Sequence, residues 1–312
     1  MMKRLVVLLL AVVAISFSGF AQDVKVNIKK GIPYCTSYFP GEDKMQKLFL
    51  DFYEPAGKSD TLRPLVITLF GGAYVIGTRD YADMVEWCTR YAQAGYAAAS
   101  IDYHLMSASK ITAVNMIRTG YMAAQDVSAA VRFFKAHWKD YRIDTNRIFL
   151  LGQSAGAVSI LHAIFLTEDE RPQETFLEPA LSPLHSQGDK KSCAQTFSVA
   201  GAVLLWGSIF DPEMIDADET TPICMIHGGK DWILDADSGC AFSIPILPYV
   251  YGSNTIAKRL QELGASSFEN HFLEQESHAF YFKHLYLYQI DALKFDICWD
   301  IAHDFTERVG KK

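Results

Sequence analysis

The stretch Arg147–Ala157, RIFLLGQSAGA, decides the fold that the rest of the chain has to complete. Its apolar part, residues 148–151, is long enough for one buried strand and runs directly into Gly152-Gln153-Ser154-Ala155-Gly156, which fits G-x-S-x-G. Apolar residues then continue at helical spacing. The glycines leave room around a serine at a sharp strand-to-helix turn, which exposes its hydroxyl at a helix N-terminus. The pentapeptide alone also fits an ordinary Gly-Ser turn, but this context favours a nucleophile at Ser154.

Apolar strands alternate with helical patterns over most of the chain. Strands are predicted at 24–28, 47–53, 64–70, 96–103, 148–151, 200–206, 222–227 and 267–273, and helices at 81–94, 112–138, 253–263 and after 290. Nearly continuous apolar strands followed by helices indicate a mostly parallel sheet covered by helices. The closing helix carries its apolar face on Ile290, Leu293, Ile297, Ile301 and Phe305. Without a linker or a repeat, residues 22–312 are predicted to form one α/β domain.

A serine hydroxyl is a weak nucleophile at neutral pH and needs a histidine to take its proton and a carboxylate to orient that histidine. Asp231 ends the run MIHGGKD after a predicted strand, and His278 lies in ESHAF after the last strand. Serine, acid and histidine in this chain order are typical of a G-x-S-x-G turn at a catalytic site. Asp211 is the rival acid, and His227 is expected to shape the turn that carries Asp231.

The tetrahedral intermediate of such a reaction carries an oxyanion that backbone N–H groups stabilise. One donor is predicted from Ala155, and others from Gly72 and Ala73 in the loop after the strand at 64–70, with Gly71 as the turn. The Gly-Gly pair by itself also fits a plain turn before a helix. Aromatic residues near the inferred strand ends are candidates for a substrate pocket or else for the core: Tyr74, Trp206, Phe210 and Trp232.

The N-terminus has a pattern of its own. Lys3 and Arg4 are followed by apolar residues at 5–17 and by Ser18-Gly19-Phe20-Ala21. This is typical of a secretory signal peptide at 1–21, cleaved after Ala21, and predicts an exported protein that is periplasmic or secreted. The apolar run is shorter than the about 20 residues of a membrane span, so no stable span is expected after cleavage. An uncleaved anchor is the alternative.

Composition excludes some partners and cofactors. The formal net charge of −7 becomes −9 when Lys3 and Arg4 are removed, and without a basic stripe nucleic acid is not expected as a partner. The six cysteines lack metal-site spacing, so no metal is predicted. Cys88 and Cys224 are expected to be buried thiols. Cys193 and Cys240 lie in polar or irregular segments of an exported chain and are candidates for a disulfide.

Two long segments interrupt the alternation, residues 168–198 and residues 233–252. Both follow the carboxyl ends of predicted strands, the edge at which open α/β sheets bind ligands. Long loops in compact domains are usually functional or disordered. The two segments are therefore expected either to cover the site as a small lid or to decorate the surface.

These blocks together resemble the secreted esterase/lipase branch of the α/β-hydrolase superfamily, near its carbohydrate-ester and feruloyl-esterase-like members. The matching blocks are residues 70–77, 102–105, 126–134, 143–157, 227–231 and 277–280. The resemblance implies an eight-stranded, mostly parallel sheet, hydrolysis of carboxylic esters through an acyl-enzyme, and no cofactor. The sequence departs from the family in one place, because the family's His-Gly-Gly-Gly becomes Phe70-Gly71-Gly72-Ala73, which puts the geometry of that loop in question.

The sequence therefore predicts an exported serine hydrolase with Ser154 as nucleophile, His278 as general acid and base, and Asp231 as the orienting carboxylate. Its expected substrates are small-molecule or polysaccharide-linked esters with short-chain, aryl or sugar-linked acyl groups. One alternative is a serine peptidase of the same fold, which is expected to have a Gly-Gly pair where this chain has Gly156-Ala157. The other is a catalytically silent binding protein, which the altered loop at Phe70 favours.

Overall fold

An eight-stranded sheet forms the centre of this computed structural model, which describes residues 24–38, 45–57, 60–218, 221–284 and 289–311. The strand order is β1-β2-β4-β3-β5-β6-β8-β11. β2 pairs antiparallel with β1 and β4, and all pairs from β4 to β11 are parallel. The prediction of an eight-stranded, mostly parallel sheet is confirmed. The predicted signal peptide lies outside the described residues.

The strands of this sheet are β1 (Val26–Tyr38), β2 (Met45–Pro55), β3 (Arg63–Leu69), β4 (Ala97–Ile101), β5 (Ile143–Gln153), β6 (Gly201–Leu205), β8 (Ile223–Gly228) and β11 (Phe268–Leu273). Two small sheets, β7-β10-β9 and β12-β13, consist of β7 (Ser208–Ile209), β9 (Ser238–Cys240), β10 (Tyr249–Gly252), β12 (Phe282–His284) and β13 (Gln289–Ile290). The apolar run of β5 at 148–151 is fully buried, as expected for a strand with helices on both faces.

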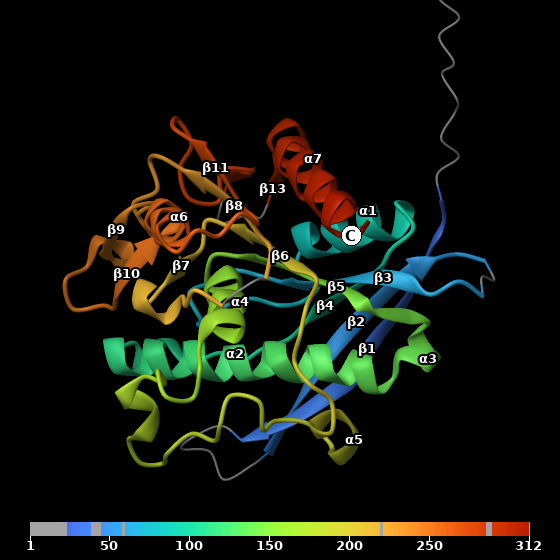
Figure 1. Cartoon of the computed structure of the whole chain (residues 1–312), viewed down its shortest axis with the longest axis horizontal. Coiled ribbons are helices and arrows are strands. Elements are labelled where there is room, and N and C mark those ends of the chain that lie inside the picture. The colour runs from blue at the N-terminus through green and yellow to red at the C-terminus, as the bar shows by residue number, and fades with distance from the viewer. Residues whose placement is uncertain (1–23, 39–44, 58–59, 219–220, 285–288, 312) are drawn as a thin grey trace, which may run out of the picture.

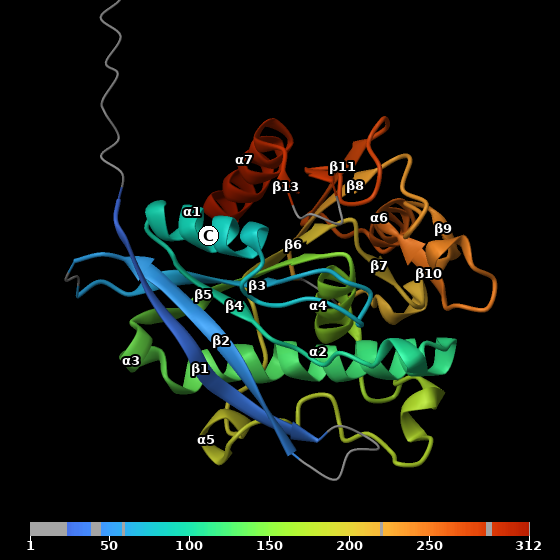
Figure 2. The same cartoon turned by 180° about the vertical axis from the view of Figure 1, so that it is seen from behind.

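Helices cover the two faces of the sheet. Figures 1 and 2 show α1 (Ala82–Gln93) and α7 (Ala292–Val309) on one face and α2 (Ala113–Ala136) and α4 (Ala155–Phe165) on the other. The remaining helices are α3 (Trp138–Tyr141), α5 (Lys190–Cys193) and α6 (Ser253–Glu262), with 3₁₀ turns η1 (Ala108–Lys110), η2 (Gln173–Phe176), η3 (Pro212–Met214) and η4 (Ala241–Ser243). No helix in the described ranges is long and apolar enough to cross a membrane.

The closing helix packs by part of the predicted face: Phe305 is buried and Ile290 and Ile301 pack against the core. α7 buries Phe295, Cys298, Ala302, Phe305 and Thr306, whereas Leu293 is 77% and Ile297 48% exposed. Phe295 decides this orientation, because its ring inserts between Trp87 and Tyr281 at centroid distances of 4.6 and 5.1 Å. The buried face therefore includes Phe295 and Cys298, which the predicted face left out, and excludes Leu293 and Ile297.

Residues 168–198 pack beneath α2 (Figures 1 and 2). Arg118 on α2 donates to the carbonyls of Glu174, Leu177 and Pro179, at 2.5, 2.9 and 2.6 Å. Further along α2, Gln125 and Arg132 bind other carbonyls of the segment. These contacts hold the segment against α2, because α2 supplies the donors that its backbone carbonyls need. They agree with the second of the two alternatives for 168–198, a surface segment.

All six cysteines are free thiols, so Cys193 and Cys240, the two candidates for a disulfide, are not bridged. Cys193 ends α5, which packs against α2, and Cys240 lies in β9 at another part of the surface (Figures 1 and 2). Cys88 and Cys224 are buried, as predicted.

Candidate active site

Ser154 occupies the sharp turn between β5 and α4, with φ 51° and ψ −123°. A Cβ at Gly152 would lie 2.7 Å from the backbone N of Ala157, and one at Gly156 would lie 2.6 Å from the carbonyl of Leu69. Neither contact is possible for a side chain, so both glycines are required by the packing around the turn. The strained serine backbone that results is of the kind that concentrates at functional sites.

His278 connects Ser154 to Asp231. Its Nε2 lies 2.9 Å from the Ser154 Oγ, and its Nδ1 lies 2.7 Å from the Asp231 Oδ2. β8 and β11 are parallel neighbours, so the loops that follow them meet at one edge of the sheet. The backbone N–H of Lys230 donates to the carbonyl of Glu276 at 2.8 Å and ties the two loops together. The structure therefore brings the three predicted residues into hydrogen-bond contact, whereas Asp211, the rival acid, is exposed and caps η3.

Four hydrogen bonds hold the carboxylate of Asp231. Its Oδ1 accepts the backbone N–H groups of Ile233 and Leu234, both at 2.9 Å, and its Oδ2 faces His278 and the Nε2 of His227, the latter at 3.1 Å. Burial by itself would raise the pKa of Asp231, but the hydrogen bonds from His227 and His278 outweigh it and hold this pKa well below its usual range. A carboxylate that stays ionised can fix the tautomer of His278 and stabilise its protonated form.

The loop after β3 lies against the nucleophile. Gly72, Ala73 and Tyr74 have φ values of 135°, 55° and 63°, and a Cβ at Gly72 would lie 1.8 Å from the carbonyl O of Ile76. A Cβ at Gly71 would lie 3.1 Å from the Ser154 Cβ. The N–H of Ala155 is among the first of α4, where no acceptor exists within the helix. Ala73 and Ala155 line one cavity together with Ser154. Backbone N–H groups that stabilise an oxyanion formed at Ser154 have to lie beside it in this way.

Phe70, which stands where the family has histidine, is part of the packed core beneath this loop. Its ring stacks on Tyr103 at 4.3 Å, and the hydroxyl of Tyr103 donates to the Phe70 carbonyl at 2.7 Å. A Cβ at Gly77 would come within 2.2 Å of the Phe70 ring, so the ring also fixes the far end of the loop. Aromatic packing thus organises a loop for which the sequence left the geometry in question.

A buried polar cluster lies directly behind the nucleophile and was not predicted. Gln153 donates to Asp83 at 2.6 Å, and the Tyr281 hydroxyl lies 2.9 Å from Asp83 and 2.7 Å from the Gln153 side-chain carbonyl. Burial raises the pKa of Asp83 to about 6, against the lowering effect of these hydrogen bonds. The x position of G-x-S-x-G is therefore tied to α1 and to the segment after His278. Partners so far apart in the chain leave no local signal.

Two cavities meet at Ser154. The smaller has a volume of about 40 Å³ and the larger about 370 Å³. Tyr74 and Phe210 line the smaller cavity and Trp206 lines the larger, whereas Trp232, the fourth aromatic candidate, is 61% exposed and lines neither. Trp232 follows Asp231 directly, but the Asp231 side chain is the one that turns inward.

The segment 233–252 borders both cavities. Ile233 and Phe242 line the two of them, and the smaller one also touches Leu234, Ala241, Pro248 and Val250. Phe242 has φ 58° and ψ 18°, an unusual conformation for a bulky residue. This segment therefore supplies walls to both cavities at Ser154.

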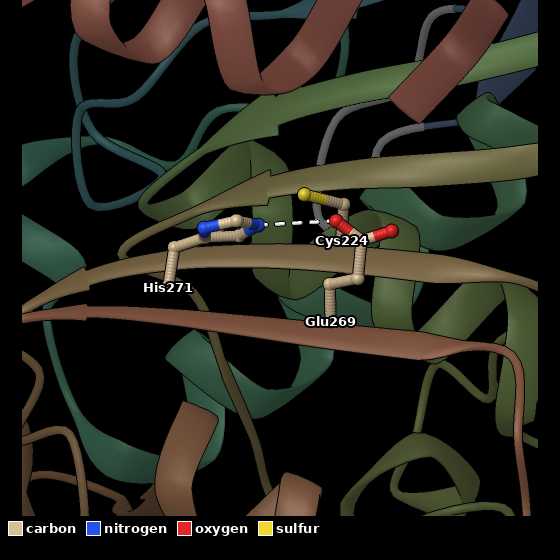
Figure 3. Close-up of side chains that lie close together, drawn as sticks. All are labelled: Cys224, Glu269 and His271. Atoms are coloured by element: carbon tan, nitrogen blue, oxygen red, sulfur yellow. Dashed lines mark hydrogen bonds and ion pairs between the residues drawn. The ribbon is translucent and has the colours of Figure 1, made fainter. Parts of the chain in front are cut away.

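One group of potential metal ligands lies at the opposite end of β8, on the amino-terminal side. Figure 3 shows the side chains of Cys224, Glu269 and His271 gathered on one side of β8 and β11, with ligand atoms within 4.8 Å of one another. The carboxylate of Glu269 already pairs with the guanidinium of Arg308, and burial raises the pKa of the Cys224 thiol. A metal would need this thiol as a thiolate, so we assign no metal here.

Comparisons with known proteins agree with this architecture. A family model described as BD-FAE matches residues 50–211, about half of the chain. A probable isoprenylcysteine alpha-carbonyl methylesterase of Oryza sativa subsp. japonica is 32% identical over 123 residues, covering 39% of this chain and 26% of the relative. Gut esterase 1 of Caenorhabditis elegans is 30% identical over 124 residues, which cover 40% of this chain and 21% of the relative. The chain thus spans about a quarter of the length of these curated relatives.

Solved structures show the fold over almost the whole chain. Thermogutta terrifontis esterase 2 phosphorylated by paraoxon superposes with a TM-score of 0.60 at 17% identity, covering 93% of this chain and 95% of that chain. With the G-x-S-x-G turn, the sheet order and the family match in agreement, the chain belongs to the BD-FAE family and has the α/β-hydrolase fold of esterases.

Proposed function

We propose that this chain hydrolyses carboxylic esters through an acyl-enzyme on Ser154. The observation that carries the proposal is the continuous hydrogen-bonded series from Ser154 Oγ through His278 to Asp231, at 2.9 and 2.7 Å. The names of the curated relatives, and the phosphorylation of the Thermogutta esterase by paraoxon, support the same chemistry.

The reaction follows from the geometry. Ser154 Oγ attacks the acyl carbon while His278 Nε2 takes its proton, and Asp231 stabilises the imidazolium that forms. The N–H groups of Ala155 and of the loop at Gly72 and Ala73 stabilise the oxyanion. Collapse breaks the bond to the alkoxy oxygen, which leaves as the alcohol with the proton from His278. Water, deprotonated by His278, then releases the acid and restores Ser154.

We also propose that residues 1–21 direct export, so that the mature protein begins at Gln22 and meets its substrate outside the cytoplasm. The positive start, the apolar run and the small residues before Gln22 support this proposal. The expected substrates remain small-molecule or polysaccharide-linked esters. Expression of the full chain, fractionation and mass analysis of the N-terminus test the export step. A mature chain that still begins at Met1 would overturn it.

The catalytic proposal is tested with p-nitrophenyl acetate on the wild-type protein, on Ser154→Ala and on Ser266→Ala, whose serine is exposed before β11. We expect hydrolysis by the wild type and by Ser266→Ala, with loss of at least about a thousandfold in kcat for Ser154→Ala. Paraoxon should add one phosphoryl group to Ser154 in the intact protein. A wild type that neither hydrolyses esters nor becomes labelled would contradict the proposal and favour a silent binding protein.

A further inference from the structure

Three side chains behind the active site form a closed triangle of hydrogen-bond distances. Gln153 Nε2 lies 2.6 Å from Asp83 Oδ2, and the Tyr281 hydroxyl lies 2.9 Å from the same Oδ2 and 2.7 Å from Gln153 Oε1. We call this triangle the Asp83 ring. Its members are at most 3% exposed. The hydrogens for the three contacts therefore have to come from these side chains themselves.

A count of hydrogens shows that Asp83 is protonated when the ring is closed. Two of the three contacts join oxygen to oxygen, and each of them needs one hydrogen. The Tyr281 hydroxyl has a single hydrogen, so the second has to come from the carboxyl of Asp83. Exchanging the nitrogen and oxygen of the Gln153 amide does not alter the count, because two contacts still join oxygen to oxygen.

We propose that Asp83, Gln153 and Tyr281 are positioning residues for the reaction, and that the proton on Asp83 closes the ring that holds Ser154 and His278 in register. Without this proton one oxygen-to-oxygen contact has no hydrogen, so the two oxygens repel each other and the ring opens. This inference rests on the proposed function, and it adds a control by a group outside the catalytic residues.

Short stretches of backbone connect the ring to the catalytic residues. Gln153 is the last residue of β5 and directly precedes the nucleophile. On the other side, the N–H of Phe282 donates to the carbonyl of Ala279 at 2.9 Å, and this tight turn joins Tyr281 to His278. A shift at either end of the ring is therefore passed to the contact between the nucleophile and the general base.

The surroundings of the ring favour the protonated form. Asp83 forms no ion pair with any residue that the structure describes, and burial raises its pKa to about 6. Burial also raises the pKa of the thiols of Cys88 on α1 and Cys298 on α7, so both stay neutral. On β2, Asp51 is paired with Arg79 at 2.9 Å. Asp83 thus keeps its proton to a higher pH than an ordinary carboxyl does.

Infrared difference spectra of the intact protein test the proton itself. The spectrum of the wild type minus that of Asp83→Asn should contain the carbonyl band of a protonated carboxylic acid. The band should be present at about pH 5 and disappear as the pH rises through about 6. Absence of the band at about pH 5 would overturn the inference.

Matched substitutions separate positioning from packing. Asp83→Asn supplies N–H hydrogens in place of the acid proton, so its kcat for p-nitrophenyl acetate at about pH 5 should stay within about threefold of the wild type. Asp83→Leu fills a similar volume without a hydrogen to donate, and should lower kcat about tenfold to a hundredfold with little change in KM. A loss in Asp83→Asn equal to that in Asp83→Leu would contradict the inference.

Tyr281→Phe removes the hydroxyl from the ring and should also lower kcat about tenfold or more, again with little change in KM. Tyr96→Phe is the matched control, because the Tyr96 hydroxyl likewise binds a carboxylate, that of Glu307 at 2.7 Å, and Tyr96 lines neither cavity. Equal kcat values in the two variants would show that the ring has no part in positioning.

The ratio of kcat in the wild type to kcat in Asp83→Asn isolates the titration of Asp83, because titrations common to both proteins cancel. It should fall about threefold to tenfold between about pH 5 and about pH 8, since only the wild type loses the ring proton. A ratio that is constant over this range would contradict the control by Asp83.

The outcomes also separate this inference from the proposed function. Ester hydrolysis that depends on Ser154 but is equal in the wild type, Asp83→Leu and Tyr281→Phe would overturn the inference and leave the proposed function intact. An absence of both hydrolysis and paraoxon labelling in the wild type would overturn the proposed function, and the positioning role with it. If Asp83→Leu or Tyr281→Phe does not fold, the infrared band and the kcat ratio to Asp83→Asn decide.

Discussion

The Nε2 of His227 lies 3.1 Å from the Oδ2 of Asp231, the oxygen that also accepts a hydrogen bond from His278. The same Nε2 lies 2.8 Å from the carbonyl of Leu234, so both of its neighbours are acceptors and this nitrogen carries the proton. His227 is fully buried and lines neither cavity. It acts on the reaction through Asp231 as a positioning residue.

His227→Phe removes this donor and should lower kcat roughly tenfold to a hundredfold with little change in KM, because a hydrogen bond to a charged group contributes about 1.5–3 kcal/mol. His227→Gln can still donate an N–H and should lose less. Steady-state kinetics on p-nitrophenyl acetate check both values. Wild-type kcat in His227→Phe would show that Asp231 needs no second histidine.

Gly77→Ala should disrupt the loop that carries the oxyanion donors. The new Cβ would lie 2.2 Å from the Phe70 ring, at a φ of 138° that side chains rarely adopt. We expect kcat to fall about a hundredfold, which is the size of effect seen when an oxyanion donor is lost. Gly95→Ala is the control, since Gly95 also has a positive φ, of 94°, but nothing within 4 Å of the added Cβ. It should cost about 1–3 kcal/mol of stability and leave kcat unchanged. If kcat fell equally in Gly77→Ala and Gly95→Ala, backbone strain alone would explain the loss, and the contact with the Phe70 ring would have no role in it.

Asp83 gives the unfolding free energy a pH dependence of definite sign. Its pKa is raised from 3.8 to about 6 in the folded chain, so the native state binds this proton more tightly than the unfolded state does. Protonated Asp83 therefore stabilises the folded state fully below about pH 4, and this stabilisation is lost as the pH rises through about 6. The free energy of unfolding changes by roughly 3 kcal/mol at most over this range.

Asp83→Asn removes this titration, so its Tm relative to the wild type should increase from about pH 4 to about pH 7. Thermal unfolding followed by circular dichroism measures the difference. Asp80→Asn is the control, because a hydrogen bond from Thr78 lowers the pKa of the exposed Asp80, so its titration lies below about pH 4 and its Tm difference should stay nearly constant from pH 4 to pH 7. A Tm difference between Asp83→Asn and the wild type that is constant with pH would contradict the assignment.

Arg118→Met tests the position of the segment 168–198. The substitution leaves three backbone carbonyls without their donor and should destabilise the segment by about 2–4 kcal/mol, so that proteases cut within it sooner. No residue of the segment lines either cavity, so kcat for p-nitrophenyl acetate should not change. Lys258→Met, a substitution of an exposed cation on α6, should change neither property. A fall in kcat would favour the lid interpretation for this segment.

The sheet and the three residues at its edge could be predicted because local sequence encodes them. Gly152 and Gly156 are required by contacts within a few residues of Ser154 or with the adjoining strand end. Asp231 and His278 each follow an apolar strand, and parallel strands bring such positions together without further information.

Features that depend on docking between distant elements could not be predicted. The contacts of the Phe295 ring with Trp87 and Tyr281 place this residue in the buried face of α7, and hydropathy alone does not show them. The bonds of Gln153 to Asp83 and Tyr281 join parts of the chain 70 and 128 residues apart. The division of the site into two cavities likewise depends on side chains from five or more elements.

The attachment of His278 to β11 has a consequence for how activity is lost. β11 is one edge of the sheet, pairs only with β8 and keeps its residues partly exposed. β5, which leads into Ser154, is central and is buried from residue 148 to residue 153. Local unfolding of an edge strand needs less free energy than melting of the whole domain. Mild denaturant should therefore abolish turnover while amides of β5 remain protected from hydrogen exchange. Inactivation would then report the detachment of a single strand and not the stability of the fold.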